Sequence, residues 1–392
     1  MGLAPGIAAV LRGCVAHHEP GEATRTALQR VPTGELSGLA RAAAYHGVSS
    51  YLLAASDEGG ALPTDEREQL REQRRATAID HLRMLGNLRF LHGVLDEADV
   101  PWLAIKGPTL AEPVHGSPVL RGYADLDIIV PPSLLRDAIA ALTAAGADLI
   151  DRNWTLLRAE MKGEVHLALP SGTELDLHWH LLNDRDRREN FPIRVKGLFE
   201  RSRTVKVGGL DVPTIDAADT VVYVALHSVL SGADRLIWIK DVERLLAADL
   251  AGLEAIADRA RRWRAELALA AILRRVEATI GLPDDAVPLL SMLPRHRVWT
   301  AISDRAWRAY PVEREDGLGS PGRLVARSVR ATQRRTLRTI ATKARRSALG
   351  SLRGPREGGH RIIDPDHPGS GRYESGGEAM REAYLDAVAQ ES

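Results

Sequence analysis

Cysteine is nearly absent from this 392-residue chain, which has Cys14 alone. A disulfide within the chain is therefore excluded, which is typical of a reducing compartment. Apolar runs long enough to span a bilayer are absent as well. The apolar stretch near the start follows no basic segment, so it predicts a short helix and not a signal peptide. The expected location is the cytoplasm.

The chain also has no excess of either charge and few aromatic residues. The 52 basic and 52 acidic residues cancel, so no overall field draws the chain to nucleic acid or to a membrane. Aromatic residues make up 4%, while alanine and arginine are plentiful, a composition typical of helices. With 44% hydrophobic and 27% charged residues, the chain is globular and long enough for two or three domains.

The period of the hydrophobic pattern changes along the chain. Helical spacing fills 1–98, strand patterns with an interposed helix fill 99–215, and helical spacing returns over 216–311. Beyond it, 312–392 predicts a basic helix and a flexible tail, because apolar residues thin out there. We expect an α/β fold with a mixed β-sheet, flanked by N-terminal and C-terminal helical regions.

Two aspartates stand in one of the predicted strands, "RGYADLDIIV". Asp125 and Asp127 are two residues apart, so they project from the same face. Neighbouring carboxylates repel each other unless a cation stands between them. Mg²⁺ prefers one or two carboxylates together with phosphate oxygens. A magnesium site is one interpretation, and solvated acids at a frayed strand end are the other.

A third carboxylate lies on the alternating segment "TELDLHWHLL". Glu174, Asp176, His178 and His180 share its polar face. Three carboxylates on neighbouring strands can hold two divalent ions, an arrangement used for displacement at phosphorus. His-x-His is also a ligand spacing for zinc or manganese. The two histidines therefore predict either such a site or contacts that support the carboxylates or the acceptor.

Two cations fit phosphate chemistry. Lys106 ends an apolar strand just before Gly107, where the backbone turns closely. Arg121 precedes Asp125 by four residues and offers a planar fork for phosphate oxygens. We expect Lys106, Gly107 and Arg121 to bind a nucleotide, with ordinary surface cations as the alternative.

Three segments in order resemble the uncharacterised nucleotidyltransferase family of the DNA polymerase β-like superfamily. "AIKGPTLAEPVHGSPVLRGYADLDIIV" resembles its Lys-Gly turn, short helix, Arg and Asp-x-Asp strand. "ELDLHWHL" resembles its Asp-Leu-His-Trp motif. "LHSVLSGADRLIWIKDVERLL" resembles its helical histidine segment and aspartate-bearing helix, which brings in His227 and Asp241. The resemblance spans roughly 75–250 of the chain.

This resemblance implies a minimal nucleotidyltransferase core and a metal-dependent transferase. Asp125, Asp127 and Asp176 would be both catalytic residues and ligands of Mg²⁺, with Mn²⁺ as the other candidate ion. A nucleoside triphosphate such as ATP would donate its nucleotidyl group to an acceptor hydroxyl or phosphate on a small molecule, peptide or glycan. Natural-product or polysaccharide biosynthesis is the expected setting.

One departure supports a second hypothesis. The usual Gly-Gly or Gly-Ser turn of the superfamily is Lys106-Gly107-Pro108 here, and Pro108 has no backbone donor for phosphate. The alternative is a catalytically silent protein that retains the fold and binds a nucleotide or polyanion. His227 and Asp241 are expected either to face the cleft or to serve as buried structural groups.

The segment 323–353 is rich in arginine and contains no acid. A rough apolar stripe makes it a basic amphipathic helix, which can bind nucleic acid or an anionic surface. The alternative is a solvated helix packed on the body of the protein.

Overall fold

The computed structural model describes residues 3–57, 62–294, 296–309, 321–352 and 372–391. The chain divides into two compact units. Unit 1 comprises Met1–His81, Leu110–Gly122 and Ala217–Lys343, and unit 2 comprises Leu82–Thr109, Tyr123–Asp216 and Ala344–Ser392. The four segments expected from the sequence divide the chain differently, by type of secondary structure, and that division stays a prediction.

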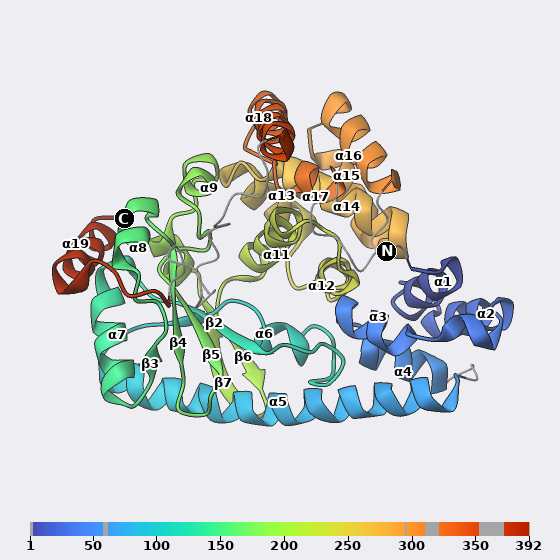
Figure 1. Cartoon of the computed structure of the whole chain (residues 1–392), viewed down its shortest axis with the longest axis horizontal. Helices are drawn as coiled ribbons and strands as arrows, with labels where there is room; N and C mark the ends of the chain where they lie inside the picture. The colour runs from blue at the N-terminus through green and yellow to red at the C-terminus, as the bar shows by residue number, and fades with distance from the viewer. Residues whose placement is uncertain (1–2, 58–61, 295, 310–320, 353–371, 392) are drawn as a thin grey trace. The chain divides into compact units, whose positions relative to one another are not determined.

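Unit 1 is helical in the part of the chain that the structure describes. The long helix α5 (Thr64–Glu97), in light blue in Figure 1, begins in unit 1 and continues into unit 2. Its first turn contains Asp65 and Glu66, whose negative charges suit the positive end of a helix. The other helices are α1 (Pro5–Cys14), α2 (Pro20–Arg30), η1 (Thr33–Leu36), α3 (Leu39–His46), α4 (Ser49–Asp57), α11 (Ala217–Ser231), α12 (Leu236–Ala247), α13 (Leu253–Arg262), α14 (Glu266–Ile280), η3 (Asp284–Ala286), α15 (Val287–Met292), α16 (Arg297–Ala309), α17 (Pro321–Ala326) and α18 (Gln333–Leu352), whose end lies in unit 2.

Unit 2 contains a seven-stranded sheet with short helices between its strands. The strands are β1 (Leu103–Ala104), β2 (Asp125–Ile129), β3 (Asp148–Leu149), β4 (Glu164–Ala168), β5 (Glu174–His178), β6 (Arg203–Val207) and β7 (Leu210–Thr214). The helices are α6 (Pro108–Ala111), which ends in unit 1, η2 (Pro132–Leu134), α7 (Leu135–Ala144), α8 (Trp154–Glu160), α9 (Arg185–Asn190), α10 (Val195–Glu200) and α19 (Gly377–Ala389).

The sheet is mixed, with the order β3-β4-β5-β2-β1-β7-β6. Strand β2 pairs in parallel with β5 and β1 pairs in parallel with β7, whereas the other pairings are antiparallel. Strands β4 and β5 form one antiparallel hairpin, and β6 and β7 form another. The prediction of an α/β fold with a mixed sheet is therefore confirmed.

Alternation along the strands separates an apolar face of the sheet from a polar one. Leu126 and Ile128 of β2 and Leu175 and Leu177 of β5 belong to the buried core of unit 2. The residues between them therefore face the other side, and these are the acids and histidines of interest. Burial of the leucine face sets the register, because a slip by one residue would exchange the two faces.

The end of the chain corrects the expectation of a flexible tail. Residues 377–389 form α19, and its Tyr384, Leu385 and Val388 lie in the core of unit 2. Tyr384 donates a hydrogen bond to the Lys162 backbone oxygen at 2.7 Å and accepts one from Trp179 at 2.9 Å. The Gly- and Pro-rich stretch before this helix lies mostly outside the described residues.

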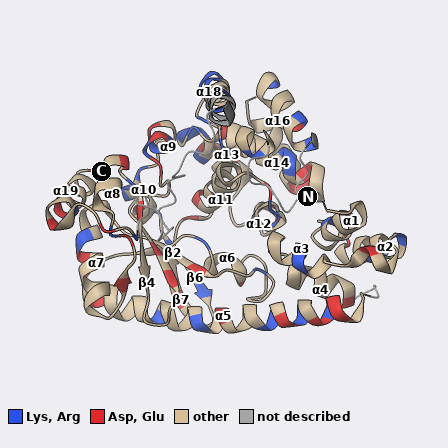
Figure 2. Cartoon of the chain, in the orientation of Figure 1, with Lys and Arg blue, Asp and Glu red and all other residues tan. Residues whose placement is uncertain are grey.

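The basic segment expected as one helix over 323–353 is two helices, α17 and α18, with the chain between them non-helical. In Figure 2 the described part of α18 is coloured for Lys and Arg and has no residue coloured as Asp or Glu. Across the described ranges, no helix is both long enough and apolar enough to cross a membrane.

Candidate active site

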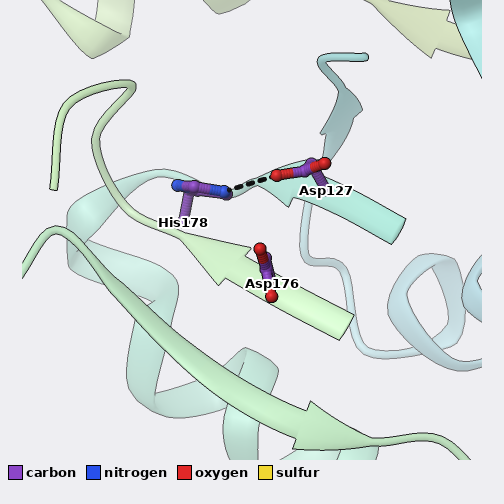
Figure 3. A group of neighbouring side chains, drawn as sticks. All are labelled: Asp127, Asp176 and His178. Atoms are coloured by element: carbon purple, nitrogen blue, oxygen red, sulfur yellow. Dashed lines mark hydrogen bonds and ion pairs between the residues drawn. The ribbon is translucent and has the colours of Figure 1, made fainter. Parts of the chain in front are cut away.

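Three polar side chains meet on neighbouring strands of unit 2. The parallel pairing of β2 and β5 places Asp127 opposite Asp176. Figure 3 shows both carboxylates beside His178, which lies two residues beyond Asp176 on the same face of β5. One ligand atom from each of the three lies within 4.8 Å of the others. The structure thus brings together two of the three predicted carboxylates and one of the two predicted histidines.

Asp127 is buried, with 1% exposure, and two cationic groups meet the same oxygen. Lys106 Nζ lies 2.8 Å from Oδ1, and His178 Nε2 lies 3.1 Å from it. Burial alone would raise the pKa of Asp127, but the charge of Lys106 and the contact with His178 outweigh burial and hold this pKa below its usual range. Asp127 is therefore a carboxylate.

The other oxygen of Asp127 is in a different situation. Oδ2 is buried and has no hydrogen-bond partner among the described residues. An orphaned carboxylate oxygen costs free energy unless a cation or donor meets it. This oxygen is the clearest sign in the structure of a place for an additional cation.

Asp176 on β5 lies between Asp127 on β2 and the buried His166 on β4. Burial, followed by the charge of Asp127, raises the pKa of Asp176 to about 7. His166, which is opposite Asp176 on β4, opposes this shift with its Nε2 atom 3.5 Å from Oδ1. Asp151 holds His166 by accepting hydrogen bonds from its ring at 2.6 Å and from its backbone N–H at 3.0 Å.

These contacts favour the cationic forms of His166 and His178. Burial lowers the pKa of His166, but Asp151 outweighs it and raises the pKa to about 10. The pKa of His178 is also raised, because Glu164 and Asp127 outweigh the effect of burial. His178 Nδ1 lies 3.1 Å from Glu164 Oε2, a charge contact without hydrogen-bond geometry.

The residues present fit a divalent cation. Two carboxylates in register on neighbouring strands, with one buried oxygen unsatisfied, are the donor type that Mg²⁺ and Mn²⁺ prefer. A second group able to hold an ion consists of His166, Glu174 and Asp176, so Asp176 belongs to both.

Two of the predicted site residues lie outside these groups. Asp125 is exposed at the first position of β2, paired in register with Glu174, and is a member of neither group. His180 lies beyond the end of β5, where it contacts the Ile193 oxygen at 3.1 Å and accepts a hydrogen bond from the Leu182 N–H. Burial lowers the pKa of His180 to about 3, so it is a neutral structural histidine. The prediction that it shares the polar face of the strand is wrong because the strand ends at His178.

Gly107 turns the chain directly after Lys106. Its φ of +62° is the left-handed region that favours glycine. A Cβ at this position would make an ordinary van der Waals contact with the ring of Tyr123, 3.5 Å away, so the backbone conformation and not a lack of space favours glycine. The predicted close turn is therefore present, although the Lys106 ammonium points to Asp127.

Arg121 and Asp241 meet in unit 1. Arg121 donates two hydrogen bonds to Asp241, from Nε at 2.7 Å and from Nη2 at 2.9 Å. His115 Nε2 lies 2.9 Å from the same carboxylate, and the Tyr51 hydroxyl lies 2.6 Å from His115 Nδ1. The fork of Arg121 is therefore held by a buried carboxylate, and its predicted role toward phosphate would require it to leave Asp241.

His227 lies on α11 in unit 1, with its ring edge-to-face with Trp238 at a centroid distance of 6.2 Å. A second ring, that of Tyr223, lies 6.1 Å away. These contacts fit a histidine packed among aromatic rings. Its predicted contact with the acceptor stays a prediction.

Several residues of the site escaped the sequence analysis. Glu164 and His166 alternate in "GEVHLALP", the same pattern that singled out the next strand, and this signal could have found them. Asp151 carries no such signal, because it lies outside the strands and reaches His166 only through the fold. In unit 1, His115 likewise contacts Asp241 and Tyr51 contacts His115, each from a distant part of the sequence.

A cavity of about 1090 Å³ in unit 2 contains none of these carboxylates. It lies among residues that precede β1 and follow β2, including Trp102, Pro131 and Phe199. Asp125 and Asp127 lie at the start of β2, whereas the lining of the cavity includes residues beyond the end of that strand. The volume of this cavity therefore does not mark the carboxylate site.

Comparisons with known proteins agree with the motifs. The model of a family described as uncharacterised nucleotidyltransferase matches residues 33–281. The chain belongs to this family of nucleotidyltransferases and is a transferase by that membership. The resemblance predicted from the sequence is thereby confirmed. A comparison with curated proteins finds no match.

Two solved structures are similar to parts of the chain. The antibiotic-resistance factor ANT(2'')-Ia is 15% identical, with 50% of this chain and 95% of that chain covered and a TM-score of 0.30. An antigenic nucleotidyltransferase-like protein from Paracoccidioides brasiliensis is 14% identical, with 56% and 96% covered and a TM-score of 0.33.

Proposed function

We propose that the protein is a Mg²⁺-dependent nucleotidyltransferase that moves a nucleoside monophosphate from a triphosphate to an acceptor hydroxyl or phosphate and releases pyrophosphate. The observation that carries the proposal is the pairing of Asp127 with Asp176 beside His178, with Oδ2 of Asp127 unsatisfied. A divalent cation held there would neutralise phosphate charge and lower the pKa of the attacking hydroxyl. Mn²⁺ fits the same oxygens.

Each residue of the site has a defined role in this proposal. Asp127 and Asp176 would hold the cation, and Asp125, exposed at the start of the same strand, would join them when the substrate is bound. Asp176 would also accept the proton of the acceptor. His178 holds Asp127 at 3.1 Å, and His166, fixed by Asp151, faces Asp176.

Lys106 would serve two partners in turn. Before a cation binds, its ammonium neutralises Asp127 at 2.8 Å. Once the carboxylate has another counter-ion, Lys106 is released to meet the outer phosphates, which a point charge on a flexible stem can do. This sequence of contacts reconciles its predicted phosphate role with its observed position. The role of Arg121 toward phosphate stays a prediction, because Asp241 holds its fork within unit 1.

Calorimetric titration with each of the four nucleoside triphosphates, with Mg²⁺ or with chelator, tests the proposal without knowledge of the acceptor. Binding should require Mg²⁺, and Asp127→Asn and Asp176→Asn should each weaken it by about tenfold or more. Asp211→Asn is the matched control, since Asp211 is an exposed acid of unit 2 that pairs with Lys206. Equal affinity in chelator for the wild type would contradict the metal-dependent mechanism.

The second candidate is a catalytically silent nucleotide-binding protein of the same fold. The observation that favours it is the neutralisation of Asp127 by Lys106 and His178, which fills one side of the carboxylate. Such a protein would bind triphosphate equally with and without Mg²⁺. The same titration therefore separates the two candidates. Acceptor class and the setting in natural-product or polysaccharide biosynthesis stay predictions.

A further inference from the structure

Unit 1 contains a cavity of about 520 Å³ whose lining is unusually basic. Its walls come from α1, α14, α15 and α16, and Figure 2 shows where basic residues lie on α14 and α16. The charged lining residues are Arg12, Arg274, Arg275, Arg308, Glu277 and Asp304. Four positive and two negative charges leave a net charge of +2 in a chain whose total is zero.

The two acids of the cavity have partners of their own. Asp304 pairs with Arg274. Glu277 Oε2 accepts a hydrogen bond from the Leu282 backbone N–H at 2.9 Å. Arg308, in contrast, is exposed and makes no ion pair with any residue that the structure describes. The positive charge of the cavity is therefore incompletely balanced by its own acids.

The inner wall is a rigid, buried pair. Arg275 is 7% exposed and Trp307 is 5% exposed. The guanidinium of Arg275 lies 5.1 Å from the centre of the indole ring and donates to the Trp307 backbone oxygen at 3.4 Å. The indole Nε1–H of Trp307 is buried and lacks a hydrogen-bond partner within the described ranges. A buried donor without an acceptor is costly and commonly marks a missing ligand or water.

We infer that this arginine cavity is a binding site for a small molecule carrying two or more phosphate groups. Guanidinium groups meet phosphate oxygens in pairs, and each phosphate offers up to two negative charges and three acceptor oxygens. A cavity of this volume fits a small ligand and not a folded polyanion. The inference does not depend on the reaction proposed for unit 2, because all of its residues belong to unit 1.

Inorganic pyrophosphate is the simplest probe. Calorimetric titration of the full chain would be performed in chelator and 0.15 M salt, where metal-assisted binding at the carboxylates of unit 2 is absent. Arg308→Glu should weaken pyrophosphate binding by about tenfold or more, since it removes a charge-assisted contact and adds repulsion. Arg12→Glu should act in the same direction. Arg262→Glu on α13 is the matched control, an exposed arginine of the same unit outside the cavity.

Two further comparisons test the chemical class of the ligand and the location of its binding site. Citrate has similar charge but no phosphate, and it should bind at least several-fold more weakly. Lys196→Met removes an exposed lysine of unit 2 and should leave pyrophosphate binding unchanged. Absence of binding by the wild type, equal weakening by Arg262→Glu, equal affinity for citrate, or loss of binding in Lys196→Met would each overturn the inference. Unchanged thermal unfolding of Arg308→Glu verifies that a loss of binding is not a loss of fold.

Discussion

Lys106→Met tests whether Lys106 neutralises Asp127 when no metal ion is bound. At 2.8 Å and an effective dielectric constant of about 20, the attraction between Lys106 and Asp127 is about 6 kcal/mol before dehydration is counted. Removal of one partner from a buried pair costs about 3–5 kcal/mol. His178 also contacts Asp127, so we expect the low end, about 3 kcal/mol, in the absence of metal.

The loss of unfolding free energy in Lys106→Met should be smaller when a divalent cation is bound. The cation would neutralise Asp127 in place of the lysine, so the variant would be less stable than the wild type by only about 1 kcal/mol. The difference of about 2 kcal/mol corresponds to metal binding roughly 30 times tighter in Lys106→Met than in the wild type. Affinity for triphosphate should fall in the same variant, because the cation for the outer phosphates is gone.

Urea unfolding in chelator and in excess Mg²⁺, together with a Mn²⁺ titration, measures each quantity. Lys196→Met is the control, since the Lys196 side chain in the same unit is 86% exposed and lies 3.8 Å from Glu200. An equal loss of stability with and without Mg²⁺, or metal affinity that falls in Lys106→Met, would refute the reasoning. Lys106 would then be a structural counter-ion that does not compete with a metal.

Three other predictions concern parts of the chain away from that lysine. Burial raises the pKa of Cys14 to about 12, so Ellman's reagent at pH 8 should label the protein only after denaturation. Tyr384→Ala should destabilise unit 2 by about 3–5 kcal/mol in urea unfolding because it empties a fully buried site, whereas Glu378→Ala on the exposed side of α19 should change little. The pKa of Asp241 is depressed by Arg121 despite burial, so its contribution to stability is full above the unfolded pKa of about 4 and is lost as the pH falls below it. Thermal unfolding of Asp241→Asn should therefore start lower at neutral pH and depend less on pH between about 5 and 3, and an unchanged acid dependence would contradict this assignment.

Local patterns were sufficient for the centre of the site. The polar alternation in "TELDLHWHLL" placed Asp176 and His178 on one strand face, and Asp-x-Asp placed Asp127 on another. Their pairing in register follows from burial of Leu126 and Leu175 on the opposite face. Period and burial are properties of neighbouring residues, and for this reason the sequence could predict them.

Contacts between distant segments could not be predicted in that way. Lys106 was expected to reach phosphate, but whether its ammonium meets phosphate or a carboxylate depends on where β2 lies beside β1. Arg121 was expected at phosphate, and a helix that begins more than a hundred residues later provides Asp241 for its fork. A charged side chain has no periodic pattern that identifies its partner, so only the fold decides.

Helix α19 shows that support for the site extends beyond the family motifs. The family match ends at residue 281, and α19 begins at Gly377. Its Tyr384 accepts a hydrogen bond from the indole of Trp179, which directly follows His178. Because Trp179 is fully buried, its position constrains the backbone that carries His178. A change in α19 should therefore alter the contact between His178 and Asp127 without touching either residue, and the last helix belongs to the structural basis of the site even though no motif indicates it.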